Sequence, residues 1–260
     1  MLRKLLGHGG FGDVEEIQDP NGNLIARKTL KLKGDQRDPD LIRRFKREVS
    51  YQKRIQHKNI VKILSSNLDA YPPYFDMPLA TCDLGKELSL KTLNSASSKI
   101  YPFLCLLSGI EHIHMLGQLH RDIKPENLLR FDFTDSPTIY KISDLGLISQ
   151  AKRSMTTNIT RLGSGFGSEN FLAREVYIQG FDGATVQSDI YSIGVVLFCL
   201  FASDQELSQS LPYSVRQTLH PLRKIIMKCT AERPSDRYEH IAELRSDFLL
   251  IAGQLQGVMI

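Results

Sequence analysis

The chain has 260 residues, of which 42% are hydrophobic and 24% charged, proportions ordinary for a soluble globular protein. Its formal net charge of +4 is a mild basic excess that does not by itself indicate binding to nucleic acid or to a membrane. The longest apolar run, residues 190–201, is well short of the ~20 residues needed to span a bilayer. The N-terminal residues before the first glycine are too few for a signal peptide. We therefore expect a cytoplasmic protein.

The cysteines and histidines do not indicate a metal site. The cysteines show neither a C-x-x-C pair nor another metal-type spacing, so free thiols in a reducing compartment are expected. His112 and His114 lie two residues apart and would not share a helix face. No structural metal is expected. The cysteines are Cys82, Cys105, Cys199 and Cys229.

The first part of the chain has short β-like runs and one basic helix. The sequence from Asp19 to Gly22 is a strong turn signal between two such runs, an arrangement typical of an antiparallel hairpin. Residues 39–56 place apolar side chains near helical spacing and begin at a proline, which suits a helix N-terminus. Strands are expected at residues 13–17, 24–30, 59–64 and 73–79.

From about residue 84 onward, helical patterns dominate. Residues 99–116 carry a wide apolar face with steps of three and four, and residues 188–201 are apolar all round, as in a buried helix. Between them, residues 152–168 are rich in Ser, Thr and Gly without periodicity, which predicts a loop. Ordered loops of this length are usually functional.

The stretch "GHGGFG" matches G-x-G-x-x-G through Gly7, Gly9 and Gly12, a spacing shared by two unrelated phosphate-binding loops. A dinucleotide-binding loop is followed directly by a helix. Here Gly12 is followed by a strand, a turn and a second strand. The dinucleotide interpretation is therefore rejected, and a loop over the phosphates of ATP remains, with a plain tight turn as the alternative.

Three further elements change the weight of the glycine loop. Lys28 lies on the second strand of the hairpin and Glu48 on the basic helix. The string "HRDIKPEN" follows at residues 120–127, and Asp144 begins "DLG". In this order, over essentially the whole chain, the sequence resembles the eukaryotic-type (Hanks-type) serine/threonine protein kinase catalytic domains.

The resemblance implies an α+β, bilobal protein-kinase fold in one domain of residues 1–260. A small β-rich N-lobe with one long helix would span about residues 1–76, and a hinge about 77–83. A larger, mainly helical C-lobe would follow at about 84–260. The implied cofactors are ATP and Mg²⁺, and the implied partners are protein substrates with Ser or Thr acceptors.

The resemblance also implies a nucleotide site. Glycines would let backbone N–H groups approach the phosphates, and Lys28 would pair with the α- and β-phosphates while held by Glu48. Val14 would cover the adenine, and Met77 would guard the back of the pocket. The Pro78 carbonyl and the Ala80 N–H would serve the adenine edge. The implied nucleotide-binding residues are Gly7, Gly9, Gly10, Gly12, Val14, Ala26, Lys28, Glu48, Met77, Pro78 and Ala80.

The implied catalytic residues follow from what phosphoryl transfer requires, which is positioning and charge neutralisation. Asp122 would accept or orient the substrate hydroxyl proton, and Lys124 would contact the γ-phosphate. Asn127 and Asp144 would hold Mg²⁺ with oxygen ligands, as that cation prefers. A polar surface loop is the alternative explanation of these residues taken singly.

Substrate type and regulation are implied by a few positions. Lys124, and Ser168 in the segment before the second lobe's helices, match the serine/threonine pattern. Arg121 matches the subclass whose activation loop is ordered by a phosphate, because a guanidinium is a bidentate anion receptor. Autophosphorylation is expected, with Thr160 favoured and Thr157 next. The candidate acceptors are Ser154, Thr156, Thr157, Thr160 and Ser164.

Three residues match structural roles, and three depart from the pattern. Glu175 and Arg237 are expected to pair, and Asp189 is expected to bond the backbone of the catalytic loop. The departures are Leu145 for the usual Phe, Arg174 for the usual Pro, and Arg233 for a common Asp.

Rival functions remain open. A pseudokinase scaffold would keep the fold without transfer, although such proteins typically lose Lys28, Asp122 or Asp144, which this chain retains. A small-molecule kinase would usually lack Lys124. Nucleic-acid binding by the basic helix is not expected, because the net charge is modest and few aromatic residues are interleaved. The oligomeric state is left open, including a transient dimer for autophosphorylation in trans.

Overall fold

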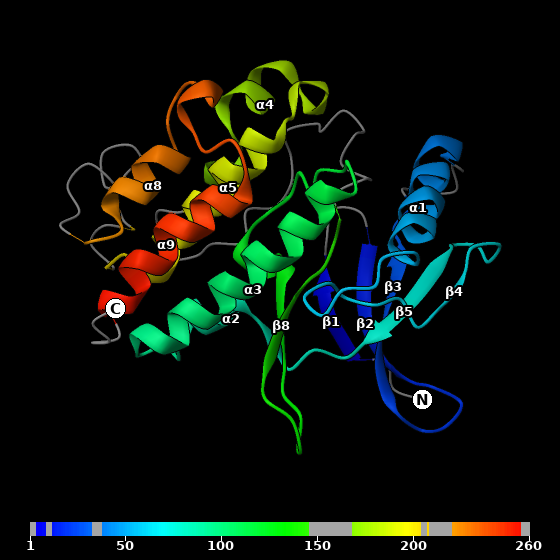
Figure 1. Cartoon of the computed structure of the whole chain (residues 1–260). Helices are drawn as coiled ribbons and strands as arrows, with labels where there is room; N and C mark the ends of the chain where they lie inside the picture. The colour runs from blue at the N-terminus through cyan, green and yellow to red at the C-terminus, as the bar shows by residue number, and fades with distance from the viewer. Residues whose placement is uncertain are drawn as a thin grey trace.

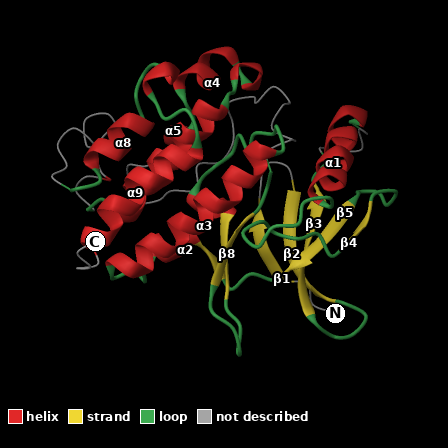
Figure 2. Ribbon diagram, in the orientation of Figure 1, coloured by secondary structure: helices red, strands yellow, loops and turns green. Residues whose placement is uncertain are grey.

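The structure is a computed structural model that describes residues 4–8, 12–32, 38–145, 168–203, 207 and 220–255. Two parts are visible in Figure 1, with a β-sheet and helix α1 on one side and a larger helical part on the other. Figure 2 shows that nearly all strands of the first part lie in one sheet, whereas helices make up most of the second. The α+β, two-lobed architecture expected from the sequence is confirmed.

The N-lobe is a five-stranded sheet with α1 packed on it. The strand order is β1-β2-β3-β5-β4, and every neighbouring pair is antiparallel. Alternate residues of β3 and β5 face α1 and form a small core with it, because successive side chains of a strand point to opposite faces. The elements are β1 Lys4–His8, β2 Gly12–Gln18, β3 Leu24–Leu30, α1 Pro39–Gln52, β4 Ser65–Asn67 and β5 Tyr74–Pro78.

The hairpin that joins β2 to β3 forms as its sequence predicts. The carboxylate of Asp19 accepts hydrogen bonds from the backbone N–H groups of Asn21 and Asn23, at 2.9 and 2.8 Å. Gly22 has φ of 84°, the left-handed conformation that glycine adopts without steric cost. The turn thereby fixes the register in which Val14 lies opposite Lys28.

Helix α1 begins at the predicted proline. The side chain of Asp38 caps it by accepting from the N–H groups of Asp40 and Leu41. Phe45 and Val49 are fully buried against the sheet, so the predicted apolar face is confirmed. The helix ends at Gln52, earlier than the sequence pattern indicated.

The C-lobe is built on helices around a large apolar core. Helix α5 is buried on nearly all sides, as its sequence predicts, and Gly194 lets α8 approach it closely. The aromatic rings of Phe103 on α3 and Phe248 on α9 pack with centroids 4.6 Å apart. The helices are α2 Leu84–Ser89, α3 Ala96–Met115, α4 Arg174–Gln179, α5 Val186–Phe201, α8 Arg223–Cys229 and α9 Ile241–Leu255.

A small sheet lies between the helices and the N-lobe. Its strands pair antiparallel in the order β6-β7-β8. The catalytic-loop string precedes β7, and Asp144 follows β8, so this hairpin positions both ends of the candidate site. The strands are β6 Cys82–Asp83, β7 Leu128–Phe131 and β8 Ile139–Ile142.

One predicted strand is wrong. Residues 59–64 form a loop in which Ile60 makes a single bridge to Ile142 of β8, and β4 begins at Ser65. The β-branched side chains of this loop are buried, but the Asn59 amide also bonds the Tyr140 carbonyl at 2.9 Å. Burial against another segment therefore produced the apolar pattern that was interpreted as a strand.

Within the described residues, none of the helices has both the length and the apolar character required to cross a membrane. Cys105, Cys199 and Cys229 are buried free thiols, and Cys82 is a partly exposed free thiol.

Candidate active site

The glycine hairpin lies at the start of the N-lobe sheet. A β-carbon on Gly12 would lie 2.7 Å from the Thr29 carbonyl oxygen, so β2 and β3 can approach this closely because Gly12 has no side chain. Gly7 ends in open space, with nothing within 4 Å of such an added carbon. Gly9 and Gly10 lie outside the described residues.

The residues expected around an adenine ring belong to one apolar group. Val14 of β2, Ala26 of β3 and Met77 of β5 pack in the same cluster as Leu129 of β7. Leu129 comes from the C-lobe, so apolar side chains of both lobes meet here. Pro78 is the last residue of β5, and Ala80 packs against the same cluster two residues later.

The expected catalytic residues of the loop before β7 contact one another directly. Lys124 donates from Nζ to Asp122 Oδ2 at 2.9 Å. Asn127 donates from Nδ2 to the Asp122 carbonyl at 2.7 Å and to Asp122 Oδ2 at 3.0 Å. The Asp122 carboxylate is thereby held between an ammonium and an amide, and its side chain remains 20% exposed.

Asp189 fixes the backbone of this loop from below. Its Oδ2 accepts from the His120 N–H at 2.8 Å, and its Oδ1 accepts from the Arg121 N–H at 2.9 Å. His114 on α3 bonds Asp189 Oδ2 through Nε2 at 2.8 Å. Burial opposes the charge of Asp189, but these bonds outweigh burial and lower the pKa of its carboxyl. The expected contact between Asp189 and the loop is confirmed.

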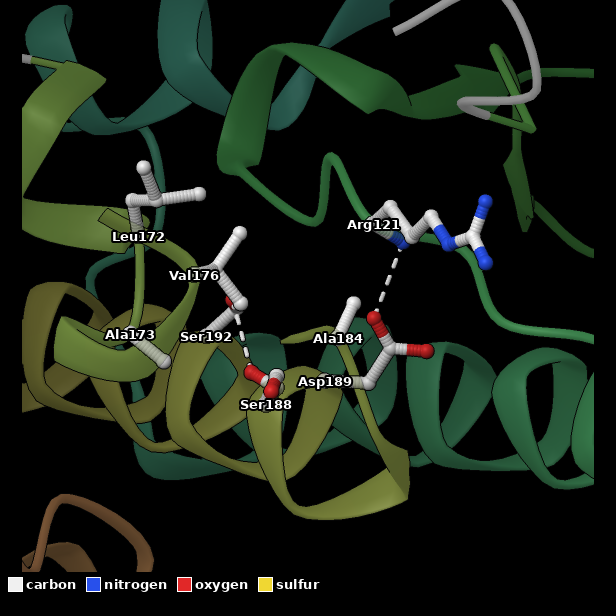
Figure 3. Close-up of a pocket in the computed structure, with 8 residues that line it drawn as sticks. All are labelled: Arg121, Leu172, Ala173, Val176, Ala184, Ser188, Asp189 and Ser192. Carbon is white, nitrogen blue, oxygen red and sulfur yellow. Dashed lines mark hydrogen bonds between the residues drawn. The ribbon is translucent and has the colours of Figure 1, made fainter. Parts of the chain in front are cut away.

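The loop contains backbone strain that these bonds hold in place. Arg121 has φ of 67° and Asp144 has φ of 61°, a region that is uncommon for residues with a side chain. Figure 3 shows the Arg121 N–H bonded to Asp189 while the guanidinium extends away from that carboxylate. Its Nε and Nη1 atoms are buried without a hydrogen-bond partner among the described residues.

His120 connects the loop to the segment that carries Asp144. Its Nδ1 accepts from the Asp122 N–H at 3.3 Å, so Nε2 carries the proton and donates to the Ser143 carbonyl at 3.2 Å. Burial lowers the pKa of His120, which keeps the ring neutral. The Ser143 N–H in turn donates to the Asn127 carbonyl at 2.9 Å. Asp122, Asn127 and Asp144 are therefore positioned by one hydrogen-bonded unit.

Lys28 reaches this unit from the N-lobe. Its Nζ donates to Asp144 Oδ1 at 2.6 Å, although the two residues are 116 positions apart. The expected ion pair between Lys28 and Glu48 is not formed. Both carboxylate oxygens of Glu48 are buried without a hydrogen-bond partner among the described residues.

The pKa values of this group explain the difference. Burial raises the pKa of Glu48 to about 8, despite the opposing charge of Lys28. Burial lowers the pKa of Lys28, but the carboxylates of Asp144 and Glu48 together raise it by more. Near neutral pH, Lys28 is therefore charged and bound to Asp144, whereas Glu48 is largely protonated. The charge of Asp122 also reaches Lys28, so the four groups form one electrostatic cluster.

Beside the loop, α4 is fixed to the segment before α9 as the sequence predicts. Arg237 donates from Nη1 and Nη2 to the two carboxylate oxygens of Glu175, at 2.6 and 3.0 Å. Next to this buried pair, Arg174 forms an exposed ion pair with Glu232. Arg174 replaces the usual proline and supplies this second connection. Leu145 is buried, so it fills an apolar position after Asp144.

The whole chain was then compared with known proteins. A family model described as "Protein kinase domain" matches residues 1–252. The chain belongs to the protein kinase family.

Known relatives of this kinase domain are named as serine/threonine kinases. The chain is 28% identical over 94% of its length to "Probable serine/threonine-protein kinase PknB" of Lactococcus lactis, and covers 40% of that protein. It is 31% identical over 95% of its length to "Serine/threonine-protein kinase PrkC" of Bacillus subtilis, covering 39% of it. Against "CBL-interacting protein kinase 9" of Oryza sativa, it is 32% identical over 90% of its length, covering 48%. The chain thus spans less than half the length of these relatives.

A solved structure supports the fold of the kinase domain. The crystal structure of the Mycobacterium tuberculosis PknI kinase domain matches with a TM-score of 0.66. The alignment covers 95% of this chain and 94% of that one, at 19% sequence identity. The match shows the bilobal kinase fold.

The residues of the kinase site fit a divalent cation. The Asn127 Nδ2 group donates to Asp122, which leaves the amide oxygen as the atom that can coordinate a cation. Asp144 is 39% exposed at its side chain and uses Oδ1 for Lys28. Two oxygen donors are the chemistry that Mg²⁺ prefers. Within the described ranges, no group of three or more His, Cys, Asp or Glu residues forms a metal cluster of its own.

Two contributors to the kinase site were missed in the sequence. His114 supports Asp189, and Leu129 supplies the C-lobe part of the apolar cluster. Helical periodicity alone does not show that His114 faces α5, so the sequence held no signal for this contact. The side chain of Ser168 and the candidate phosphorylation sites lie outside the described residues; these sites are Ser154, Thr156, Thr157, Thr160 and Ser164.

Proposed function

We propose that this chain is a serine/threonine protein kinase that transfers the γ-phosphoryl group of Mg-ATP to Ser and Thr hydroxyls of proteins. The observation that carries the proposal is the contact of Lys28 with Asp144, beside the bonded unit of Asp122, Lys124 and Asn127. An ammonium, two oxygen donors for a cation and a carboxylate for a proton thus belong to one cluster. These are the groups that phosphoryl transfer requires.

Each residue has a chemical role in the proposal. Asp122 accepts or orients the proton of the substrate hydroxyl, and Lys124 contacts the γ-phosphate. Asn127 and Asp144 hold Mg²⁺, which would neutralise phosphate charge. Lys28 binds the α- and β-phosphates, and Glu48 is the carboxylate that would hold Lys28 once it leaves Asp144. The nucleotide-binding role of the glycine hairpin and of the apolar cluster around Ala26 belongs to the same proposal.

Autophosphorylation is a further part of the proposal. The Arg121 side chain has buried nitrogen atoms without a hydrogen-bond partner among the described residues, and an unpaired guanidinium favours an anion. A phosphate on the segment after Asp144 would supply that anion. Thr160 is the favoured acceptor.

The test is phosphoryl transfer by the purified chain with Mg-ATP and a generic basic protein. Asp122→Asn should reduce transfer by about 10²–10⁴-fold, as expected for removal of a proton-accepting group. Lys28→Ala should also lose transfer. Asp135→Asn is the matched control, because Asp135 is exposed on the turn before β8 and should leave transfer unchanged.

The products should be phosphoserine and phosphothreonine, identified by mass spectrometry. A wild-type chain that binds nucleotide but transfers no phosphate would support a pseudokinase scaffold and contradict the proposal. Transfer that persists in Asp122→Asn at the wild-type rate would also contradict it.

A further inference from the structure

Two histidines stack on each other away from the active-site cluster, where the loop after α1 packs on α3. The ring centroids of His57 and His112 are 4.8 Å apart, and the ring planes differ by 13°. Both side chains are partly buried. The proposed transfer reaction uses neither of them.

The stack exists because α3 approaches the loop unusually closely. A β-carbon on Gly109 would lie 2.8 Å from the Asn59 carbonyl oxygen and 2.4 Å from the Cδ1 atom of Ile142 on β8. The absence of a side chain at Gly109 therefore lets α3 contact both segments. His112 follows Gly109 by three residues, so it lies on the same helix face and meets His57.

The hydrogen bonds of His57 fix its neutral form. The Asn59 N–H donates to Nδ1 of His57 at 3.2 Å, which uses the lone pair of that nitrogen. The proton of the neutral ring is therefore on Nε2, which lies 3.5 Å from the Ser108 hydroxyl oxygen on α3. A second proton would have to bind Nδ1. Protonation of His57 therefore breaks the bond to Asn59.

The charged groups around the stack also oppose protonation. Lys58 of the loop, Lys141 of β8 and the ring of His112 on α3 all act on His57 with positive charge. Glu111, the acid within α3, is bound to Arg245 of α9 at 2.6 Å. Within the described part of the chain, no carboxylate bonds either ring. Burial first, and these charges in addition, lower the pKa of His57.

The loop that contains His57 connects the two lobes. Asn59 accepts from the Ile142 N–H of β8 at 2.8 Å, and its amide donates to the Tyr140 carbonyl at 2.9 Å. On the other side, Gln52 of α1 donates to the Val61 carbonyl at 2.9 Å. Helix α1 carries Glu48, and β8 leads to Asp144. The stack therefore lies at a junction that sets the distance between these two residues.

We propose that the His57–His112 stack is an acid-sensitive contact that holds the loop after α1 on α3 at neutral pH and releases it in mild acid. Protonation of His57 breaks its bond to Asn59 and places a cation between His112, Lys58 and Lys141. The released loop no longer fixes α1 relative to β8.

The direction of the effect on stability follows from the pKa. The ordinary value for histidine is 6.5, and the folded-state pKa of His57 is lower. The unfolded chain therefore binds this proton more readily than the folded chain. The contribution of His57 to stability is complete above pH 6.5 and is lost as the pH falls from 6.5 through the folded-state pKa.

The experiment measures Tm of the chain without nucleotide between about pH 7.5 and about pH 5.5, the range in which histidines change charge. Wild type should lose about 2–4 °C more than His57→Gln over this range, because glutamine does not titrate. His112→Phe keeps a stacked ring without its charge and should reduce the acid loss in part. His240→Gln is the matched control, because His240 is exposed beside Glu239, and it should behave as wild type.

A second measurement decides the question if a variant fails to fold. The histidine ring resonances of the wild-type chain are followed by NMR across the same pH range. His57 should titrate below 6.5, and its bond to Asn59 should be lost in the same transition, seen as a shift of the Asn59 amide. A His57 that titrates at or above its ordinary value, or parallel Tm curves for wild type and His57→Gln, would overturn the proposal. Neither readout depends on phosphoryl transfer.

Discussion

The two halves of the active site differ in how their buried charges are paired. On the C-lobe side, Asp189 receives hydrogen bonds from His114, His120 and Arg121, and its carboxyl pKa is lowered. On the N-lobe side, Glu48 is equally buried, has no hydrogen-bond partner among the described residues, and has a pKa raised to about 8.

This difference separates a fixed part of the site from a part that can change partners. A buried charge with all its hydrogen bonds holds one geometry, since any movement leaves a donor unpaired. A buried carboxyl without a partner gains energy when a cation approaches. Asp189 thus defines the catalytic loop, whereas Lys28 has two carboxyl groups, Asp144 and Glu48, between which it can exchange.

The largest effect is expected on the fixed side. Asp189→Ala leaves the N–H groups of His120 and Arg121 without an acceptor and removes what holds Arg121 at φ of 67°. The free energy of unfolding should fall by about 3–5 kcal/mol, as for removal of one partner from a buried charged network. Urea unfolding measures this loss, with the exposed Asp135→Ala as control. A loss below about 1 kcal/mol would mean that the loop holds itself.

A smaller and pH-dependent effect is expected on the exchanging side. The folded-state pKa of Glu48 is raised from 4.5 to about 8, so its contribution to stability is complete below pH 4.5 and is lost as pH rises through 8. Glu48→Gln removes this dependence, because glutamine resembles the protonated acid. The variant should therefore gain stability relative to wild type as the pH rises, measured by urea unfolding in a pH series.

The opposite slope would have a clear meaning. If wild type gained stability over Glu48→Gln with rising pH, Glu48 would be charged and paired with Lys28 in the empty protein. The contrast between the two halves of the site would then disappear.

The smallest effect is expected for the ion pair next to the buried one. Arg174 and Glu232 have side chains 66% and 73% exposed, so solvent screens their attraction. Arg174→Ala should change the free energy of unfolding by about 0–1 kcal/mol, and the change should vanish at high salt. A much larger loss would show that Arg174 acts together with the neighbouring Glu175–Arg237 pair.

The sequence was sufficient for the features that depend on local patterns. The turn at Gly22, the cap of α1 and the buried helix α5 all form as predicted, because each depends on residues close in the chain. The string "HRDIKPEN" identified the catalytic loop through resemblance. The expected contact of Asp189 with that loop is confirmed as well.

The sequence was insufficient where the outcome depends on burial or on distant segments. The choice of Lys28 between Asp144 and Glu48 depends on how strongly burial disfavours a charged Glu48, and no spacing reports that energy. Residues 59–64 have a strand-like pattern because they are buried by α3 and β8, elements that lie far along the chain. His114 is linked to Asp189 across two helices, so its role appears once both helices are placed.

The bond between Lys28 and Asp144 means that the empty protein begins with its two lobes fastened to each other. An incoming nucleotide competes with an internal counter-ion for the same ammonium group. Observed affinity is then weaker than the new contacts alone would give, by the free energy needed to undo that fastening. Compounds that leave the fastening intact avoid this loss and would select the resting molecule over the working one.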